Sequence, residues 1–189
     1  MKWLPEPYRQ NIPGFSYDLE AMRKKFIGLE TQPVAGRFPV EYDPIRRHCH
    51  MTGDTNPLYL DPEYAAKTKY GGVIVPPPFV SYFAGPGIWP RGQELPQLPP
   101  ISTPGDRNIN LTVEAEWLKP VKVGDRLSVK SRYKDLYFLS IRLDWCAVWT
   151  TTERIMMNQS GEIVAIESNL GLRHRSADQV PEGQKGPPN

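Results

Sequence analysis

Apolar and polar side chains alternate with a period of two along much of the second half of the chain. Apolar residues at positions 113, 115 and 117, for example, are separated by Glu114 and Glu116. Such alternation is typical of half-buried β-strands. The short segments at residues 121–125 and 158–162 have the composition of turns. The pattern predicts four long strands, over residues 108–118, 126–135, 140–157 and 163–175.

Helix signals occupy the first half instead. Asp43 and Asp61 are each followed by a proline, and this pair is typical of a helix start, with Asp as the N-cap and Pro in the first turn. Gly28 and Gly53 stand where two of the helical patterns end. These signals predict helices over residues 18–27, 44–52 and 62–68.

The segments between these helices and the first long strand carry weaker signals. Residues 36–41 alternate as a short strand. After the apolar run at residues 73–75 come three consecutive prolines, and a helix is predicted to begin at Pro78 and to reach Ala84. Gly85-Pro86-Gly87 then ends it.

Long strands joined by short turns and preceded by helices predict an α+β fold, with one antiparallel sheet and the helices on one face. A chain of 189 residues is long enough for one domain with a substantial core. We expect an extended N-terminal arm over residues 1–17, a single domain over residues 18–176 and a flexible tail over residues 177–189, which are rich in Gly, Pro and Gln.

Composition and charge argue against several classes of function. The 23 basic and 21 acidic residues leave a net charge of +2, and the scattered basic residues argue against nucleic-acid binding. No apolar run is long enough to span a membrane, and the N-terminus lacks a signal-peptide core, so a cytoplasmic location is expected. His48 and His50 would point to different sides of a helix, and no Cys-x-x-Cys motif is present, so no metal site is expected. Cys49 and Cys146 are expected to be reduced thiols.

The most informative segment is Thr52 to Ala65, which has the sequence TGDTNPLYLDPEYA. It resembles the signature of the (R)-specific enoyl-CoA hydratases, the MaoC-like family, in which Gly-Asp-x-Asn-Pro is followed by an aliphatic residue and His. The resemblance extends over roughly residues 20–175, through Tyr70-Gly71-Gly72 and the turns at residues 121–125 and 158–162. It implies a hot-dog fold, in which a curved antiparallel sheet wraps around a central helix and a helical segment overhangs it.

The same resemblance implies a chemistry. In the family, the Asp and His of the motif hold and activate a water that adds across the double bond of an enoyl thioester, and a neutral His suits the role of base. The matching catalytic candidates here are Asp54, Asn56 and, at the position of the His, Tyr59. The implied substrate is a coenzyme A thioester, and no other cofactor is implied.

Two positions depart from the family pattern. Tyr59 replaces the His, and a phenol with a pKa of about 10 is a poor base at neutral pH. Pro77 replaces a glycine whose N–H would meet the enolate oxygen, and proline has no N–H. Both departures resemble the degenerate hot-dog half at the N-terminal side of fused double-hot-dog hydratases, the half that is similar to fatty-acid-synthase dehydratase domains.

In that arrangement the degenerate half shapes the acyl pocket, and the other half supplies the Asp and His. The resemblance therefore implies a partner, a second small MaoC-like hot-dog subunit. The implied acyl pocket is apolar, as such pockets usually are. Its candidate lining residues are Pro77, Phe79, Tyr82, Phe83 and Trp89.

Several alternatives stay open on the sequence. Asp54 and Asn56 are also common turn formers, and Tyr59 and the aromatic residues after the prolines can simply pack in the core. Two other functions also stay open: a self-sufficient homodimeric hydratase that uses Asp54 with His48 or His50, and a non-enzymatic acyl-CoA-binding protein. A thioesterase ranks last, because no suitable nucleophile is apparent.

Overall fold

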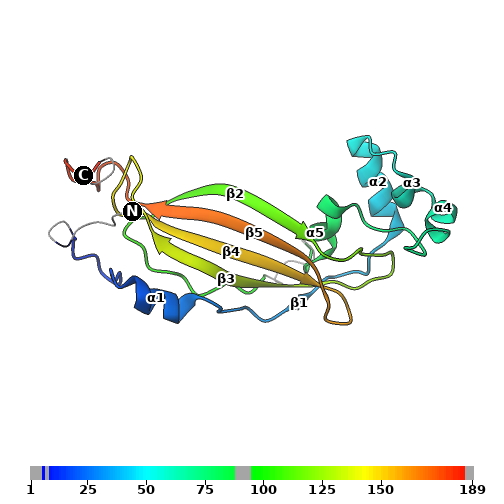
Figure 1. Cartoon of the computed structure of the whole chain (residues 1–189), viewed down its shortest axis with the longest axis horizontal. Helices are drawn as coiled ribbons and strands as arrows, with labels where there is room; N and C mark the ends of the chain where they lie inside the picture. The colour runs from blue at the N-terminus through cyan, green and yellow to red at the C-terminus, as the bar shows by residue number, and fades with distance from the viewer. Residues whose placement is uncertain (1–5, 7–8, 88–94, 186–189) are drawn as a thin grey trace.

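Four long antiparallel strands form the body of the molecule, and a two-residue strand extends one edge (Figure 1). The computed structural model describes residue 6 and residues 9–87 and 95–185. The strand order in the sheet is β1-β3-β4-β5-β2. The strands are β1 (Val34–Ala35), β2 (Arg107–Trp117), β3 (Ser128–Phe138), β4 (Val148–Met157) and β5 (Ile163–His174).

The strands differ from the predicted ranges at two places. The predicted strand over residues 140–157 begins only at Val148, because residues 141–144 form a tight turn in which Ile141 and Asp144 bond to each other. Residues 36–41 form no strand. Their N–H groups donate instead to carbonyl oxygens of loops, as Arg37 does to Gly85 and Val40 to Asp125.

The helices follow the predicted caps with one exception. Asp18 and Asp61 accept hydrogen bonds from the N–H groups of Ala21 and Tyr64, as N-cap residues do. Asp43 was predicted to cap a helix and does not: it lies inside the first turn and pairs with Arg46 and Arg47. The helical segments are α1 (Leu19–Phe26), α2 (Tyr42–Thr52), α3 (Pro57–Leu60), α4 (Pro62–Ala66), the 3-10 turn η2 (Pro77–Phe79) and α5 (Val80–Phe83).

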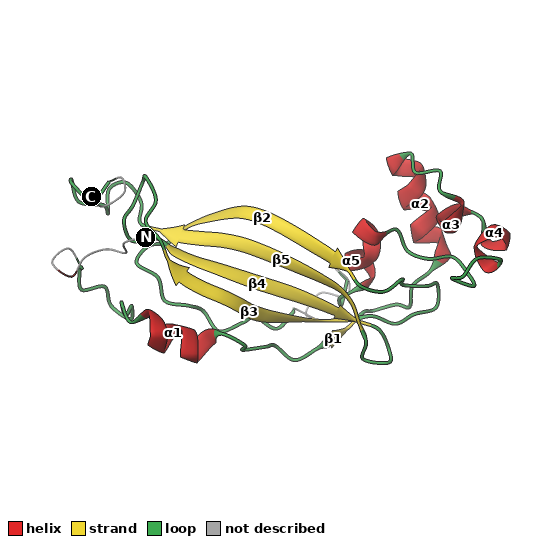
Figure 2. Cartoon of the chain, in the orientation of Figure 1, coloured by secondary structure: helices red, strands yellow, loops and turns green. Residues whose placement is uncertain are grey.

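The fold is the expected hot-dog fold, but its central helix is very short. Between α4 and β2, where this helix would lie, the described residues form only η2 and α5. Gly85 and Gly87, with φ angles of 143° and 73°, turn the chain away directly after α5. Figure 2 shows α2, α3, α4 and α5 gathered at one end of the sheet, so they overhang its end rather than cover its middle.

Two clusters of buried side chains form the core. The first lies beneath the overhanging helices and includes Ile45, Val80 and Met156. The second joins α1 to the sheet through Phe26 and Leu136. The overhanging helices therefore rest on their own apolar cluster at the end of the sheet.

A buried ion pair fixes the opposite end of the sheet. Arg175 and Asp144 are 2% and 0% exposed, and Nη2 of the arginine lies 2.6 Å from Oδ1 of the aspartate. The arginine also donates to side-chain oxygens of Gln10 and Gln184, at 2.9 Å each. Within the segment expected to be a flexible tail, the side chains of Val180 and Gln184 are buried. An arginine and its aspartate taken out of water need such further partners.

Gly36 provides a test of the packing between β1 and α5. A Cβ at this position would lie 2.3 Å from the carbonyl oxygen of Phe83 and 3.0 Å from that of Leu127. We expect Gly36→Ala to lower the free energy of unfolding by about 1–3 kcal/mol, because backbone atoms must move apart. Chemical denaturation measures this change.

Gly72→Ala is the matched control. A Cβ at Gly72 would meet no atom within 4 Å. Its free energy of unfolding should stay within about 0.5 kcal/mol of the parent, or rise slightly as the unfolded chain loses freedom. Equal destabilisation by the two substitutions would show that the contact of Gly36 with Phe83 does not constrain the fold.

Candidate functional site

The motif forms the loop between α2 and α3. Gly53, with φ 71°, ends α2, and the N–H of Asp54 donates to the carbonyl of Cys49 at 3.0 Å. Oδ1 of Asp54 then accepts from the N–H of Asn56 at 3.0 Å. Asn56 accepts in turn from the N–H of Leu58 at 3.0 Å and caps α3. Both polar side chains are half-buried and hold the loop in shape.

Tyr59 lies beside Asp54 and packs against the apolar cluster. Burial raises the pKa of its phenol, and the negative charge of Asp54 raises it further. The same two causes raise the pKa of the buried Cys49 thiol. Near neutral pH both groups therefore stay protonated, and neither is suited to be a base or a nucleophile.

Three rings stack across the gap between α2 and the start of α5. The ring of His48 lies 4.2 Å from that of Phe79 with an interplanar angle of 12°, and Phe79 lies 4.6 Å from Tyr82 at 18°. Phe83 meets Phe79 edge-on at 5.4 Å and is buried. This role for His48 was not predicted, because no sequence rule brings positions 48 and 79 together. Trp89 lies outside the described residues.

The start of the short helix has few backbone donors. Pro76, Pro77 and Pro78 carry no N–H. The next N–H groups, of Phe79 and Val80, already donate to the carbonyls of Pro76 and Pro77. The first turn therefore has no N–H left that would stabilise an oxyanion.

Two pockets lie near this turn. Each is lined by some, but not all, of the residues that were expected to line the acyl pocket. One, of about 200 Å³, lies between Pro77, Tyr70 and Trp117 at the end of β2. The other, of about 460 Å³, lies against Tyr82 and Phe83. Phe79 lines neither pocket; it stacks on Tyr82 and meets Phe83 edge-on.

Among the residues that the structure describes, no group of three His, Cys, Asp or Glu side chains is close enough together to bind a metal ion. Within the same residues, no helix has the length and apolarity needed to cross a membrane.

The sheet order and the overhanging helices together define a hot-dog fold. The FAS1-like dehydratase domain region matches residues 25–167, and the chain belongs to this family. A UPF0336 protein of Streptomyces avermitilis is 29% identical over 120 residues, which are 64% of this chain and 77% of that protein. A probable enoyl-CoA hydratase alpha subunit of Thermomonospora curvata is 27% identical over 167 residues. That match covers 84% of this chain but only 52% of the longer protein.

Solved structures share the fold. The ChsH1-ChsH2 complex of Mycobacterium tuberculosis contains a chain that aligns with a TM-score of 0.63 at 17% identity, over 79% of this chain and 90% of that one. The HadBC complex of the same organism, a 3R-hydroxyacyl-ACP dehydratase, aligns with a TM-score of 0.54 at 18% identity, over 78% and 96%. At these identities the likeness shows the fold, and the site is judged on its own residues.

Substitutions of Asp54 test whether its role in the loop is the hydrogen bond to Asn56. Asp54→Asn keeps a side-chain oxygen for this bond, so its free energy of unfolding should stay within about 0.5 kcal/mol of the parent. Asp54→Ala removes the bond and should cost about 0.5–1.5 kcal/mol. Urea unfolding measures both. A loss in Asp54→Asn as large as in Asp54→Ala would mean that the charge, and not the hydrogen bond, holds the loop.

Proposed function

We propose that the chain is the non-catalytic, pocket-shaping subunit of a heteromeric enoyl-CoA hydratase, or 3-hydroxyacyl thioester dehydratase. The observation that carries the proposal is the coincidence of two losses at one site. Tyr59 occupies the position of the base and is held neutral, and the turn from Pro76 to Val80 has no N–H to offer.

The reaction explains why both losses matter. Hydration adds the hydroxyl of a water to the β-carbon and a proton to the α-carbon of the enoyl thioester. A base must take a proton from the water, and hydrogen-bond donors must stabilise the charge that develops on the thioester oxygen. Asp54 is the only member of the family's pair that this loop retains. A second hot-dog subunit is therefore proposed to supply the Asp, the His and the N–H donors.

The edge strand β2 is the proposed surface for this partner. It is the last strand of the sheet order, so the hydrogen-bonding groups on its outer side have no strand beside them in the described chain. Its apolar side chains are unusually exposed, with Val113 at 70%, Trp117 at 48% and Leu111 at 44%. A long exposed edge with such side chains favours pairing with another strand. The relative named as an alpha subunit and the two-component complexes with the same fold support this proposal.

The proposed substrate is a coenzyme A thioester, and the addition or loss of water needs no further cofactor. The proposed site of the reaction is the cytoplasm. Three observations on the described residues agree with a binding role: the aromatic stack at Phe79, the pocket against Tyr82 and Phe83, and the pocket against Pro77.

Co-expression with a small hot-dog protein that carries the complete Asp and His motif tests the proposal. Hydration of crotonyl-CoA and of a longer enoyl-CoA is followed by the loss of enoyl thioester absorbance. We expect the purified chain alone to show the background rate and the complex to exceed it by roughly 10²-fold or more, as a positioned acid or base provides. Asp54→Asn in this chain should leave the rate of the complex within about twofold, whereas loss of the partner's His should abolish it.

Family-like rates from the chain alone would overturn the non-catalytic role. In that case His48→Ala and His50→Ala would show which histidine serves Asp54. A complex that forms and binds acyl-CoA but does not hydrate it would instead favour a binding protein.

The position of the interface has its own test. Val113→Lys places a charge at the centre of the exposed edge and should weaken complex formation by roughly 10-fold or more, because the charge would have to be buried. Val123→Lys is the matched control, since Val123 is also exposed, at 42%, but lies in a turn away from the edge. Size-exclusion chromatography and titration of the two purified subunits measure the effect. If only Val123→Lys weakened complex formation, the partner would bind away from β2.

A further inference from the structure

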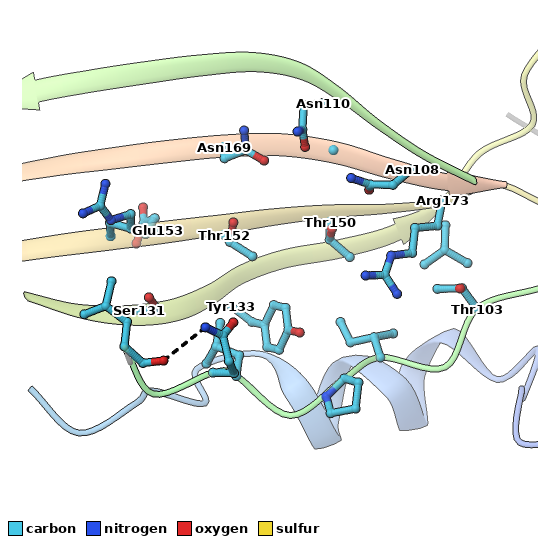
Figure 3. A pocket seen from close by; sticks show the side chains of 18 of the residues that line it. Thr103, Asn108, Asn110, Ser131, Tyr133, Thr150, Thr152, Glu153, Asn169 and Arg173 are labelled. Atoms are coloured by element: carbon cyan, nitrogen blue, oxygen red, sulfur yellow. Dashed lines mark hydrogen bonds between the residues drawn. The ribbon is translucent and has the colours of Figure 1, made fainter. Parts of the chain in front are cut away.

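A large cavity lies on the inner face of the sheet, the face covered by residues 95–103 (Figure 3). Its volume is about 630 Å³. This is within the range of roughly 300–1,000 Å³ that is usual for small-molecule sites. Its lining comes in part from β2, β3, β4 and β5, whereas the short helix α5 lies at one end of these strands (Figure 1) and contributes no residue to it. The truncated central helix therefore creates room for a ligand.

One wall of the cavity is polar, which is unusual for this face of a sheet. A sheet face that packs against a helix is normally apolar. Here Thr150 and Thr152 of β4, Asn169 of β5 and Asn110 of β2 point into the cavity. Among the described residues, none of these four side chains has a hydrogen-bond partner. The wall thus presents hydroxyl and amide groups that can each donate and accept a hydrogen bond.

The amide groups of Asn110 and Asn169 lie on either side of Gly171. Gly171 lies between them on the cavity wall, and a Cβ there would be 3.4 Å from Oδ1 of Asn110 and 3.7 Å from Oδ1 of Asn169. The absence of a side chain at Gly171 keeps the floor of the cavity open beside both. The amide groups therefore converge on the same small region.

Two of the three charged side chains in the lining are paired. Glu153 is buried and pairs with Arg132 and Lys134. Arg154 pairs with Glu167, at 2.9 Å. The third, Arg173, is exposed and forms no ion pair among the described residues. The rest of the polar wall consists of uncharged hydroxyl and amide groups, which suit neutral hydroxyl or carbonyl oxygens.

The opposite wall is apolar and leads toward the motif. Leu95 and Leu98 line the cavity from the covering segment, and Tyr133 anchors that segment by donating to the carbonyl of Pro99 at 3.0 Å. Leu95 also packs against the same apolar cluster as Tyr59. The cavity therefore begins beside the core that carries the motif loop. It opens toward β2, where Asn110 is exposed.

We propose that this cavity binds the far part of a bulky acyl group that carries hydroxyl or carbonyl oxygens, with Thr150, Thr152, Asn110 and Asn169 as specificity-determining residues. The inference rests on the proposed function for the identity of the ligand as an acyl thioester. The apolar wall would pack against the hydrocarbon, and the polar wall would hydrogen-bond to its oxygens.

The test compares two probes that differ only in oxygen. Choloyl-CoA carries ring hydroxyls on a bulky four-ring acyl group, and 5β-cholanoyl-CoA lacks them. Isothermal titration of the full chain should give at least about tenfold tighter binding of the hydroxylated probe, the effect of one or two satisfied hydrogen bonds. Equal affinities, or no binding of either probe, would overturn the proposal.

The polar wall is tested by isosteric substitution. Thr150→Val combined with Thr152→Val removes two hydroxyls and keeps the shape, and should bring the two affinities to within about twofold. The single substitutions and Asn169→Leu, each checked by thermal unfolding, serve if the double variant does not fold. Thr151→Val is the matched control, because adjacent residues of a strand point to opposite faces and Thr151 does not line the cavity.

If Thr151→Val also abolished the preference for choloyl-CoA, the cavity would not be the cause of that preference. The result is independent of the hydration assay. Catalysis by the complex without any preference for the hydroxylated probe would leave the proposed function intact and reject the cavity, and the reverse outcome would reject only the enzymatic role.

Discussion

The short central helix depends on one constraint, the polar character of the sheet face that it would have to cover. Thr150, Thr152 and Asn169 alternate along β4 and β5 so that all three face inward. An apolar helix laid across them would bury hydroxyl and amide groups without partners, at a cost of about 1–3 kcal/mol for each. The chain instead ends the helix at Phe83 and turns away through Gly85. The extended segment over residues 95–103 covers only part of the face, so a cavity is left.

The three prolines impose a second constraint on the same segment. Proline fits the first turn of a helix, because the N–H that it lacks has no partner within the helix. Three in succession, from Pro76 to Pro78, favour the turn but remove the donors that make a helix start useful for binding an anion. Among the described residues, this turn therefore has no free N–H to offer an anion. Beside Asp54, burial and the charge of that carboxylate likewise raise the pKa of the Tyr59 phenol.

Local signals were sufficient for much of the fold. Asp18 and Asp61 cap helices as predicted, and the period of two located all four long strands, because both features depend on neighbours within a few residues. The wrong prediction that Asp43 caps a helix shows the limit of this reasoning. The same Asp-Pro pair is present, but Arg46 and Arg47 offer the carboxylate stronger partners, and the helix begins two residues before the predicted proline start.

Contacts between distant residues could not be read from the sequence. The Asp54 and Asn56 turns follow from a motif of a few residues, whereas the stack of His48 on Phe79 needs the folded chain. The packing of Gln184 against Arg175 likewise joins a segment whose composition alone suggests disorder. The cavity is the clearest case, because Thr150 and Asn169 look like ordinary strand residues until strand order and register place them together.

The position of β2 links the proposed partner to the proposed ligand. The strand flanks the cavity through Asn110 and is also the free edge of the sheet. A partner strand paired with β2 would fix the position of this amide and close the side on which the cavity is open. If the ligand binds more tightly to the assembled form, ligand binding must also strengthen assembly. The gain in free energy is the same for both binding events. In the proposed complex, this chain would in this way control which acyl group reaches the catalytic residues of its partner.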